Sequence, residues 1–175
     1  MAKQIISKSA EPSFIERLDI VSNKDQSKTV SITGGTIRLM YYESILQDTI
    51  KATVTFADSG NAIDKKTVLE GLPLVGQEKV YVKFKDNNDQ QINLTLYVNK
   101  VTPLSDDTTK SMVQLDLVSK EFIMNEKVRL NTRFDGKISD HIKKILSDAN
   151  YINTQKKLDI EETSNTYNFI GNNKK

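Results

Sequence analysis

The residues from Gly71 to Val101 hold the pattern that most constrains how this chain can fold. This stretch has two parts in which apolar residues alternate with polar or amphipathic ones. In the first part, or arm, the apolar residues are Val80, Val82 and Phe84. The second arm repeats the pattern with Ile92, Leu94, Leu96 and Val98. A period of two places one set of side chains in a core and the other toward solvent or a partner. Because residues 86–91 between the arms are too polar to bury, the sequence predicts a β-hairpin. We expect Val80, Val82, Phe84, Leu94 and Leu96 to lie in the core.

Other segments with the same alternation predict more strands on both sides of this hairpin. They are Phe14–Val21, the residues around Thr29–Ile32, Thr36–Tyr42, Ile50–Ala57 and Ser111–Ser119. The adjacent Gly34 and Gly35 predict a bulge or a sharp corner, at a point where a side chain would clash. A run of strands without long helices between them favours an antiparallel sandwich or barrel over an alternating α/β domain.

The period of the apolar residues changes from two to three and four after Ser119. Lys120–Lys127 is expected to form a short helix, and Val128–Thr132 an extended segment. The stronger helix prediction is Lys137–Ala149, where Ile138, Ile142, Ile145 and Leu146 form one apolar stripe. We expect these isoleucines to dock the helix on the barrel or on a neighbouring chain. No closing element is predicted after Asn150.

These patterns define a mainly β fold with added helices. The predicted organisation is a flexible N-terminus over residues 1–13, an antiparallel barrel over 14–119 and a helical extension over 120–175. The extension is expected to lead to a further domain that this chain does not contain.

Composition excludes several classes of protein. No apolar run approaches the ~20 residues that span a bilayer, so no contact with a membrane is expected. The N-terminus has no apolar core of signal-peptide length, and the absence of cysteine suits a reducing compartment. A net charge of +2 is too small for generic attraction to nucleic acid or anionic lipid to dominate.

The sequence offers no catalytic constellation. His141, the single histidine, lies beside Asp140 and near Ser139, but no nucleophile-elbow pattern accompanies it. One histidine without cysteine does not give zinc spacing, and Asp86–Asp89 lacks the register of a calcium loop. We therefore predict no enzyme activity, no cofactor and no metal site.

A binding module is the rival interpretation. On this interpretation five cations form one basic face of the barrel, namely Lys79, Lys83, Lys85, Lys100 and Arg38. Tyr81 and Tyr97 between them would then stack on single-stranded nucleic acid or another ligand. Acidic neighbours and the small net charge favour an ordinary solvated face instead, so no specific nucleic-acid binding is predicted.

Several stretches, taken together, carry a family resemblance. They are YYESILQDTIKATVTFADSG, LEGLPLVGQEKVYVKFKDN, LYVNKVTPLS, SMVQLDLVSKEFIMNE and GKISDHIKKIL, within residues 14–150. This arrangement resembles the first part of the baseplate central hub protein of contractile-tailed bacteriophages, a family related to the hub part of type VI secretion spikes. The family's short YESI corner, its LPLVG-like approach to the sheet and its helix opening GKISD match Tyr42–Ile45, Leu72–Gly76 and Gly136–Asp140.

The resemblance implies a tail-tube-like barrel in a structural virion protein, part of a ring between the tail tube and the central spike. Hub proteins of this kind carry two such barrels per chain, whereas this chain has one. The ring would be a trimer if the full chain has two barrels and a hexamer if it has one. Implied partners are further copies, tail tube or tube-initiator proteins, the central spike and baseplate wedge proteins. The implied location is the virion tail baseplate, assembled in the host bacterial cytoplasm.

Assembly into a ring requires exposed edges and apolar surface that neighbours cover. The corner Glu43–Asp48 and the loop Asp58–Glu70 combine charged and apolar residues, so we expect both to form contacts between barrels. The individual residues predicted at such contacts are Met40, Tyr42, Ile45, Leu46, Met112 and Ile142.

Overall fold

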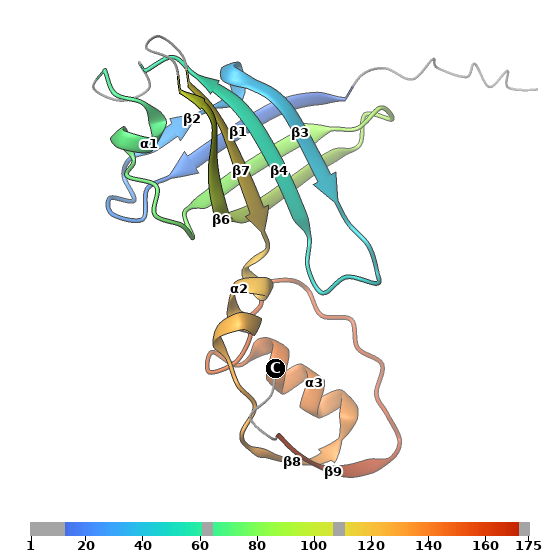
Figure 1. Cartoon of the computed structure of the whole chain (residues 1–175). Coiled ribbons are helices and arrows are strands. Elements are labelled where there is room, and N and C mark those ends of the chain that lie inside the picture. Colours follow the sequence, from blue (N-terminus) through green and yellow to red (C-terminus); the bar gives the residue numbers. More distant parts are fainter. Residues whose placement is uncertain (1–12, 61–64, 107–110, 172–175) are drawn as a thin grey trace, which may run out of the picture. The chain divides into compact units, whose positions relative to one another are not determined.

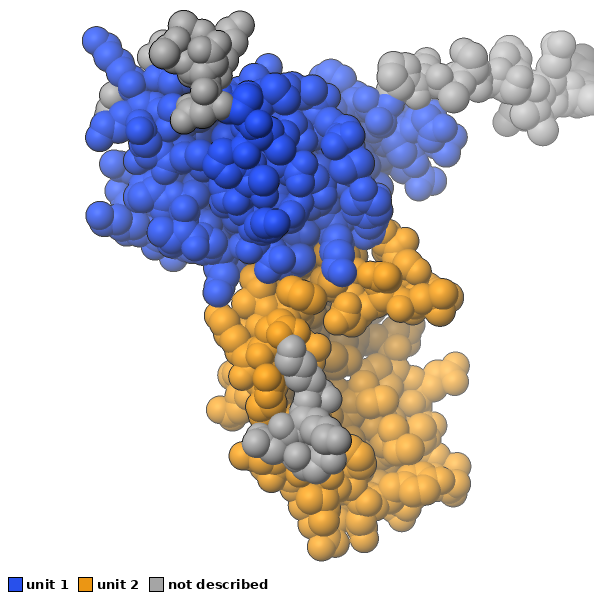
Figure 2. All heavy atoms as spheres, viewed as in Figure 1, with its two compact units in different colours: residues 1–42, 51–118 blue, residues 43–50, 119–175 orange. Residues whose placement is uncertain are grey.

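The computed structural model describes residues 13–60, 65–106 and 111–171 (Figure 1). These residues form two compact units, which Figure 2 distinguishes by colour. The first unit comprises the chain up to Tyr42 together with Lys51–Val118. The second comprises Glu43–Ile50 together with the chain from Ser119 onward. The predicted flexible N-terminus lies outside the described residues, apart from residue 13.

The first unit is built on one seven-stranded antiparallel sheet, which curls into a half-barrel (Figure 1). Its strands are β1 (Phe14–Val21), β2 (Thr29–Ser31), β3 (Thr36–Tyr42), β4 (Lys51–Asp58), β5 (Lys79–Lys85), β6 (Gln91–Asp106) and β7 (Ser111–Val118). Their order across the sheet is β2-β1-β5-β6-β7-β4-β3. The mainly β fold class and the predicted strands are confirmed.

The predicted hairpin is present as β5 and β6. Val80 pairs with Leu96, Val82 with Leu94, and Phe84 with Ile92. Val80, Val82 and Leu96 are buried, Phe84 is 9% exposed and Leu94 is half-buried. The core continues across β1, β4 and β7 through Leu18, Ile20, Ala52, Val54, Phe56, Val113, Leu115 and Leu117. The alternation therefore identified the inner face of the half-barrel correctly.

The curl of the sheet depends on the glycine corner. Thr33–Gly35 forms a single 3-10 turn, η1, which joins β2 at one edge of the sheet to β3 at the other. At one end the Thr33 hydroxyl accepts a hydrogen bond from the Leu18 amide of β1 at 2.8 Å. At the other end a Cβ on Gly35 would lie 2.5 Å from the Ala57 carbonyl oxygen of β4. A three-residue connection can join opposite edges only if the sheet curls to bring them together, and the predicted sharp corner is confirmed.

The segment between β4 and β5 is held by two buried carboxylates. Asp58 accepts hydrogen bonds from the Gly60 amide at 3.1 Å and from the Val68 amide at 2.5 Å. The Val68 amide opens a one-turn helix, α1 (Val68–Gly71), which the sequence analysis did not predict. Glu78, which is fully buried, accepts the amides of Val75 and Gly76 at 2.8–3.1 Å. These bonds satisfy backbone donors that lie outside the strands.

The second unit contains the two predicted helices and a two-stranded sheet that was not predicted. Its elements are α2 (Lys120–Lys127), β8 (Arg133–Lys137), α3 (Ile138–Ser147) and β9 (Thr166–Ile170). The strands β8 and β9 pair antiparallel, with Phe134 opposite Phe169. The expectation that no element follows Asn150 is therefore wrong, because β9 pairs with a strand about 30 residues earlier.

The buried ring of Phe134 is the centre of the second unit. It lies 5.6 Å from the His141 ring of α3, 6.1 Å from Tyr151 and 6.5 Å from Phe169. The Lys144 ammonium lies 5.8 Å from the Phe134 ring centroid. These contacts pack α3 against the β8–β9 sheet.

A second network in this unit surrounds Glu121, in the first turn of α2. The Thr154 hydroxyl donates to Glu121 Oε1 at 2.7 Å, and the Lys156 ammonium lies 3.1 Å from Oε2. Burial by itself would raise the pKa of Glu121, but these partners and further hydrogen bonds near the start of the helix lower it to about 2. The carboxylate therefore fastens residues 154–156 to α2.

Candidate assembly surfaces

The six residues predicted at contacts between chains are divided between the two units. Met40 and Tyr42 lie on the outer face of edge strand β3, and Met112 lies on the outer face of β7. The Tyr42 hydroxyl contacts the Met40 sulfur at 3.2 Å. Ile45, Leu46 and Ile142 belong to the second unit. Whether any of them touches a neighbouring chain stays a prediction.

The segment Glu43–Ile50, which extends the predicted corner Glu43–Asp48 by two residues and is called the corner from here on, presents the most exposed large apolar side chains in the described chain. Ile45 is 101% exposed and Leu46 is 90% exposed. The base of this corner is fixed, because the Thr49 hydroxyl lies 2.8 Å from that of Ser119 and the Ser119 amide donates to the Ile50 carbonyl at 3.1 Å. Two adjacent apolar side chains are thus held in solvent by a loop with an ordered base.

The other predicted contact loop, Asp58–Glu70, is described only in part. Residues 61–64 lie outside the described residues. Of the remainder, Asp58 is buried as the partner of Val68 and Gly60, and Val68 is buried in the core. Asp58, Gly60 and Val68 therefore stabilise the fold. Any contact that this loop makes with another chain would involve its exposed residues.

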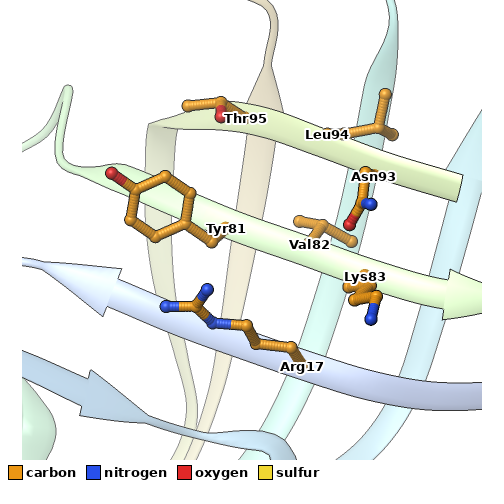
Figure 3. Close-up of a pocket in the computed structure, with 7 residues that line it drawn as sticks. All are labelled: Arg17, Tyr81, Val82, Lys83, Asn93, Leu94 and Thr95. Atoms are coloured by element: carbon orange, nitrogen blue, oxygen red, sulfur yellow. The ribbon is translucent and has the colours of Figure 1, made fainter.

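The outer face of β1, β5 and β6 has a shallow hollow of about 180 Å³ (Figure 3). Figure 3 shows Arg17 of β1 extending along the ring of Tyr81 on β5, and its guanidinium carbon lies 5.1 Å from the ring centroid. Lys83 and Asn93 line the neighbouring part, and Thr95 of β6 stands opposite Tyr81. The hollow is smaller than the ~300 Å³ at which small-molecule pockets begin.

The cations at this hollow have partners on β1. Arg17 contacts Asp19, while Glu16 lies 2.7 Å from the Lys83 ammonium and 3.5 Å from that of Lys85. The hydrogen bond from Lys83 lowers the pKa of Glu16 below its ordinary value. Sequence reasoning missed Arg17 and Glu16, because only the register of β1 against β5 brings them beside Lys83.

The basic face considered in the sequence analysis is not one patch. Lys79, Lys83 and Lys85 lie together on β5, as expected. Arg38 lies on edge strand β3, separated from β5 by β6, β7 and β4. Lys100 lies on β6, opposite Asp116 of β7. The sheet order therefore divides these five cations among three strands.

Ser139, the hydroxyl residue that the sequence places near His141, is hydrogen-bonded to Thr163. The Ser139 hydroxyl is hydrogen-bonded to the Thr163 amide and hydroxyl at 3.3 and 3.4 Å. The buried His141 Nε2 has no hydrogen-bond partner among the described residues. In the same part of the chain, no three His, Cys, Asp or Glu side chains gather closely enough to hold a metal ion. None of the described helices has the length and apolar character needed to cross a membrane.

The apolar stripe of α3 is covered only in part. Ile138 and Ile142 are 42% and 40% exposed, and Ile145 is half-buried. Tyr167, Phe169 and Ile170 of β9 are also exposed. Docking of α3 through these isoleucines, on the barrel or on a neighbouring chain, stays a prediction.

Comparison with known proteins finds a likeness among solved structures. No protein-family model and no curated protein match the chain. A solved structure of the E. coli c3393 protein matches with a TM-score of 0.46 and 11% sequence identity. That protein is described as a component of the type VI secretion system, with structural similarity to the T4 bacteriophage tail proteins gp27 and gp5. The match covers 95% of this chain and 38% of that one, so this chain spans well under half of its length.

Proposed function

We propose that this chain is a structural protein of a contractile phage tail, in the baseplate hub, where it forms a ring that joins the tail tube to the central spike. The sequence motifs that resemble the hub family support this proposal, and so does the half-barrel fold. On this proposal the protein acts by assembly and not by turnover. It resides in the tail baseplate of the virion, after assembly in the host bacterial cytoplasm.

The observation that carries the proposal is the exposure of Ile45 and Leu46. Ile45 is the last residue of the YESI motif and Leu46 follows it. Nothing in the described chain covers either side chain. Burying two such side chains against a neighbour is worth roughly 3–6 kcal/mol, at ~1.5–3 kcal/mol each. An apolar pair of this kind on a loop with an ordered base is typical of an interaction surface.

The ring proposed here consists of copies of this chain, three if the full protein has two barrels and six if it has one. Further partners are tail tube or tube-initiator proteins on one side and the central spike on the other, with baseplate wedge proteins around the ring. Met40, Tyr42, Met112 and Ile142 are proposed as additional contact positions.

The test is assembly of the double variant Ile45→Asp, Leu46→Asp. We expect the isolated protein to remain folded, because both side chains are already in solvent. Incorporation into rings should be lost, and this is measured by sedimentation of the purified chain and by electron microscopy of assembled particles. Val75→Asp is the matched control, since Val75 is another highly exposed apolar residue on a different loop. Complete rings from the double variant would exclude the corner as an interface.

A second function is favoured by the stacking of Arg17 on Tyr81 beside Lys83. Aromatic and cationic side chains in this arrangement bind single-stranded nucleic acid in other barrels. Tight binding of a single-stranded oligonucleotide at physiological salt, lost in Tyr81→Ala, would favour this ligand-binding module over the ring. Titration of the wild-type chain with a labelled oligonucleotide measures it directly.

A further inference from the structure

We infer that the hollow on β1, β5 and β6 receives the acidic corner Glu43–Ile50 of a second copy of this chain. The inference rests on the proposed function, because it names the two surfaces that would join neighbours in the ring. The hollow is lined by Arg17, Tyr81, Val82, Lys83, Asn93, Leu94 and Thr95 (Figure 3).

The first argument is the charge at the hollow. Arg17 of β1 pairs in register with Lys83 of β5, so two cations stand directly opposite each other. Like charges in this position destabilise a sheet unless anions compensate them. Asp19 and Glu16 pair with Arg17 and Lys83, the two cations that line the hollow. Lys79 and Lys85 lie on the same face of β5, so this face as a whole has four cations against two carboxylates. A further anion from a partner would therefore be favoured here.

The second argument is the charge and shape of the corner. The sequence ESILQDTI has two carboxylates, on Glu43 and Asp48, and no cation of its own, and Lys156, which lies beside it, is paired with Glu121. Its tip is the apolar pair Ile45 and Leu46. The hollow offers the matching features, since the Tyr81 ring and the stems of Arg17 and Lys83 are apolar while their ends are positive. Its volume of about 180 Å³ suits side chains and not a larger ligand.

The third argument concerns symmetry. A surface that binds itself gives a closed two-fold dimer, whereas two different surfaces that bind each other give rings or filaments. The corner and the hollow are different surfaces with opposite charge. Their pairing is therefore the heterologous type of contact that a ring of identical chains needs.

The natural chain has no cysteine, which allows the pairing to be trapped directly. Two single variants, Leu46→Cys and Thr95→Cys, are purified with tags of different mass, mixed and oxidised. The expected product is a mixed disulfide between the two chains. Its yield should be about tenfold higher than from the control pair Val75→Cys and Thr95→Cys, and a tenfold difference corresponds to a contact worth ~1.4 kcal/mol.

Charge variants provide the second measurement. Thr95→Asp places a negative charge in the hollow and leaves the Lys83 pair with Glu16 in place. It should weaken self-assembly about tenfold at low salt, and less at high salt, because exposed charges are screened there. Removing the charges of the corner with Glu43→Gln and Asp48→Gln in an otherwise unchanged chain should weaken assembly in the same direction. Unchanged circular dichroism and thermal unfolding confirm that each variant is folded.

The possible results separate this inference from the proposed function. Rings that form without the mixed disulfide, and without sensitivity to Thr95→Asp, would overturn the pairing while the proposed function stands. A wild-type chain that stays monomeric at all concentrations and salts, with its partners added, would overturn both. Oligonucleotide binding that Thr95→Asp abolishes would assign the hollow to nucleic acid and also overturn the pairing.

Discussion

Protonation of Glu121 should weaken the second unit in a narrow range of acid pH. The pKa of this carboxyl is lowered from 4.5 to about 2 in the folded chain, because Thr154 and Lys156 stabilise its charged form despite burial. Ionised Glu121 therefore favours folding fully above pH 4.5, and this contribution is lost as the pH falls toward 2. A depression of this size corresponds to at most roughly 3 kcal/mol at pH 7 and about 1 kcal/mol at pH 3.

The perturbation is Glu121→Gln, which keeps the shape of the side chain and removes its charge. Urea unfolding of the second unit can be followed through the ring protons of His141, the single histidine of the chain, in NMR spectra. We expect the variant to lose up to roughly 3 kcal/mol of unfolding free energy at pH 7, and at most about 1 kcal/mol at pH 3. Glu126→Gln, at an exposed position of the same helix, is the matched control. A loss that is the same at both pH values would refute the reasoning, because it would come from packing and not from charge.

Three further predictions concern packing. Phe84→Ala should cost ~3 kcal/mol in denaturant unfolding, because the ring is 9% exposed, and a loss below ~1 kcal/mol would place it outside the core. Gly35→Ala should cost ~1–3 kcal/mol, because the new Cβ would lie 2.5 Å from the Ala57 carbonyl oxygen. Gly34→Ala has open space at the same turn, and an equal loss there would contradict the steric argument. Ile142→Asp should cost less than ~1 kcal/mol in the isolated chain, since the side chain is 40% exposed, and a collapse of protease resistance would show that it is docked.

Local alternation explains why most of the first unit was predictable. Strands such as β4 and β7 expose one face to the core and one to the outside, so a period of two appears in their sequences. The strand β8 was missed because RFDGK contains one large apolar residue, Phe134, and a glycine. The strand β9 does alternate at Tyr167 and Phe169, but its partner is distant in sequence and the pairing has no local signal.

One of the two candidate surfaces could be predicted from the sequence and the other could not. The apolar pair Ile45 and Leu46 is visible in the sequence, because it interrupts a polar link. The hollow was not predictable, because Arg17 meets Lys83 and Tyr81 only through a sheet order that places β5 next to β1. Sheet order is a property of long-range pairing, whereas composition and periodicity describe one strand at a time.

The position of β7 has a consequence for how the chain folds as it is made. This strand is the last of the seven in sequence, yet it lies between β6 and β4. Before Ser111–Val118 leaves the ribosome, β1, β2, β5 and β6 can pair with one another and β3 can pair with β4, but no strand pairing joins these two groups. A nascent chain that ends before Ser111 therefore holds two incomplete sheets with four unpaired edges, and such edges favour aggregation. The half-barrel can therefore be completed only once β7 is available to pair with both groups.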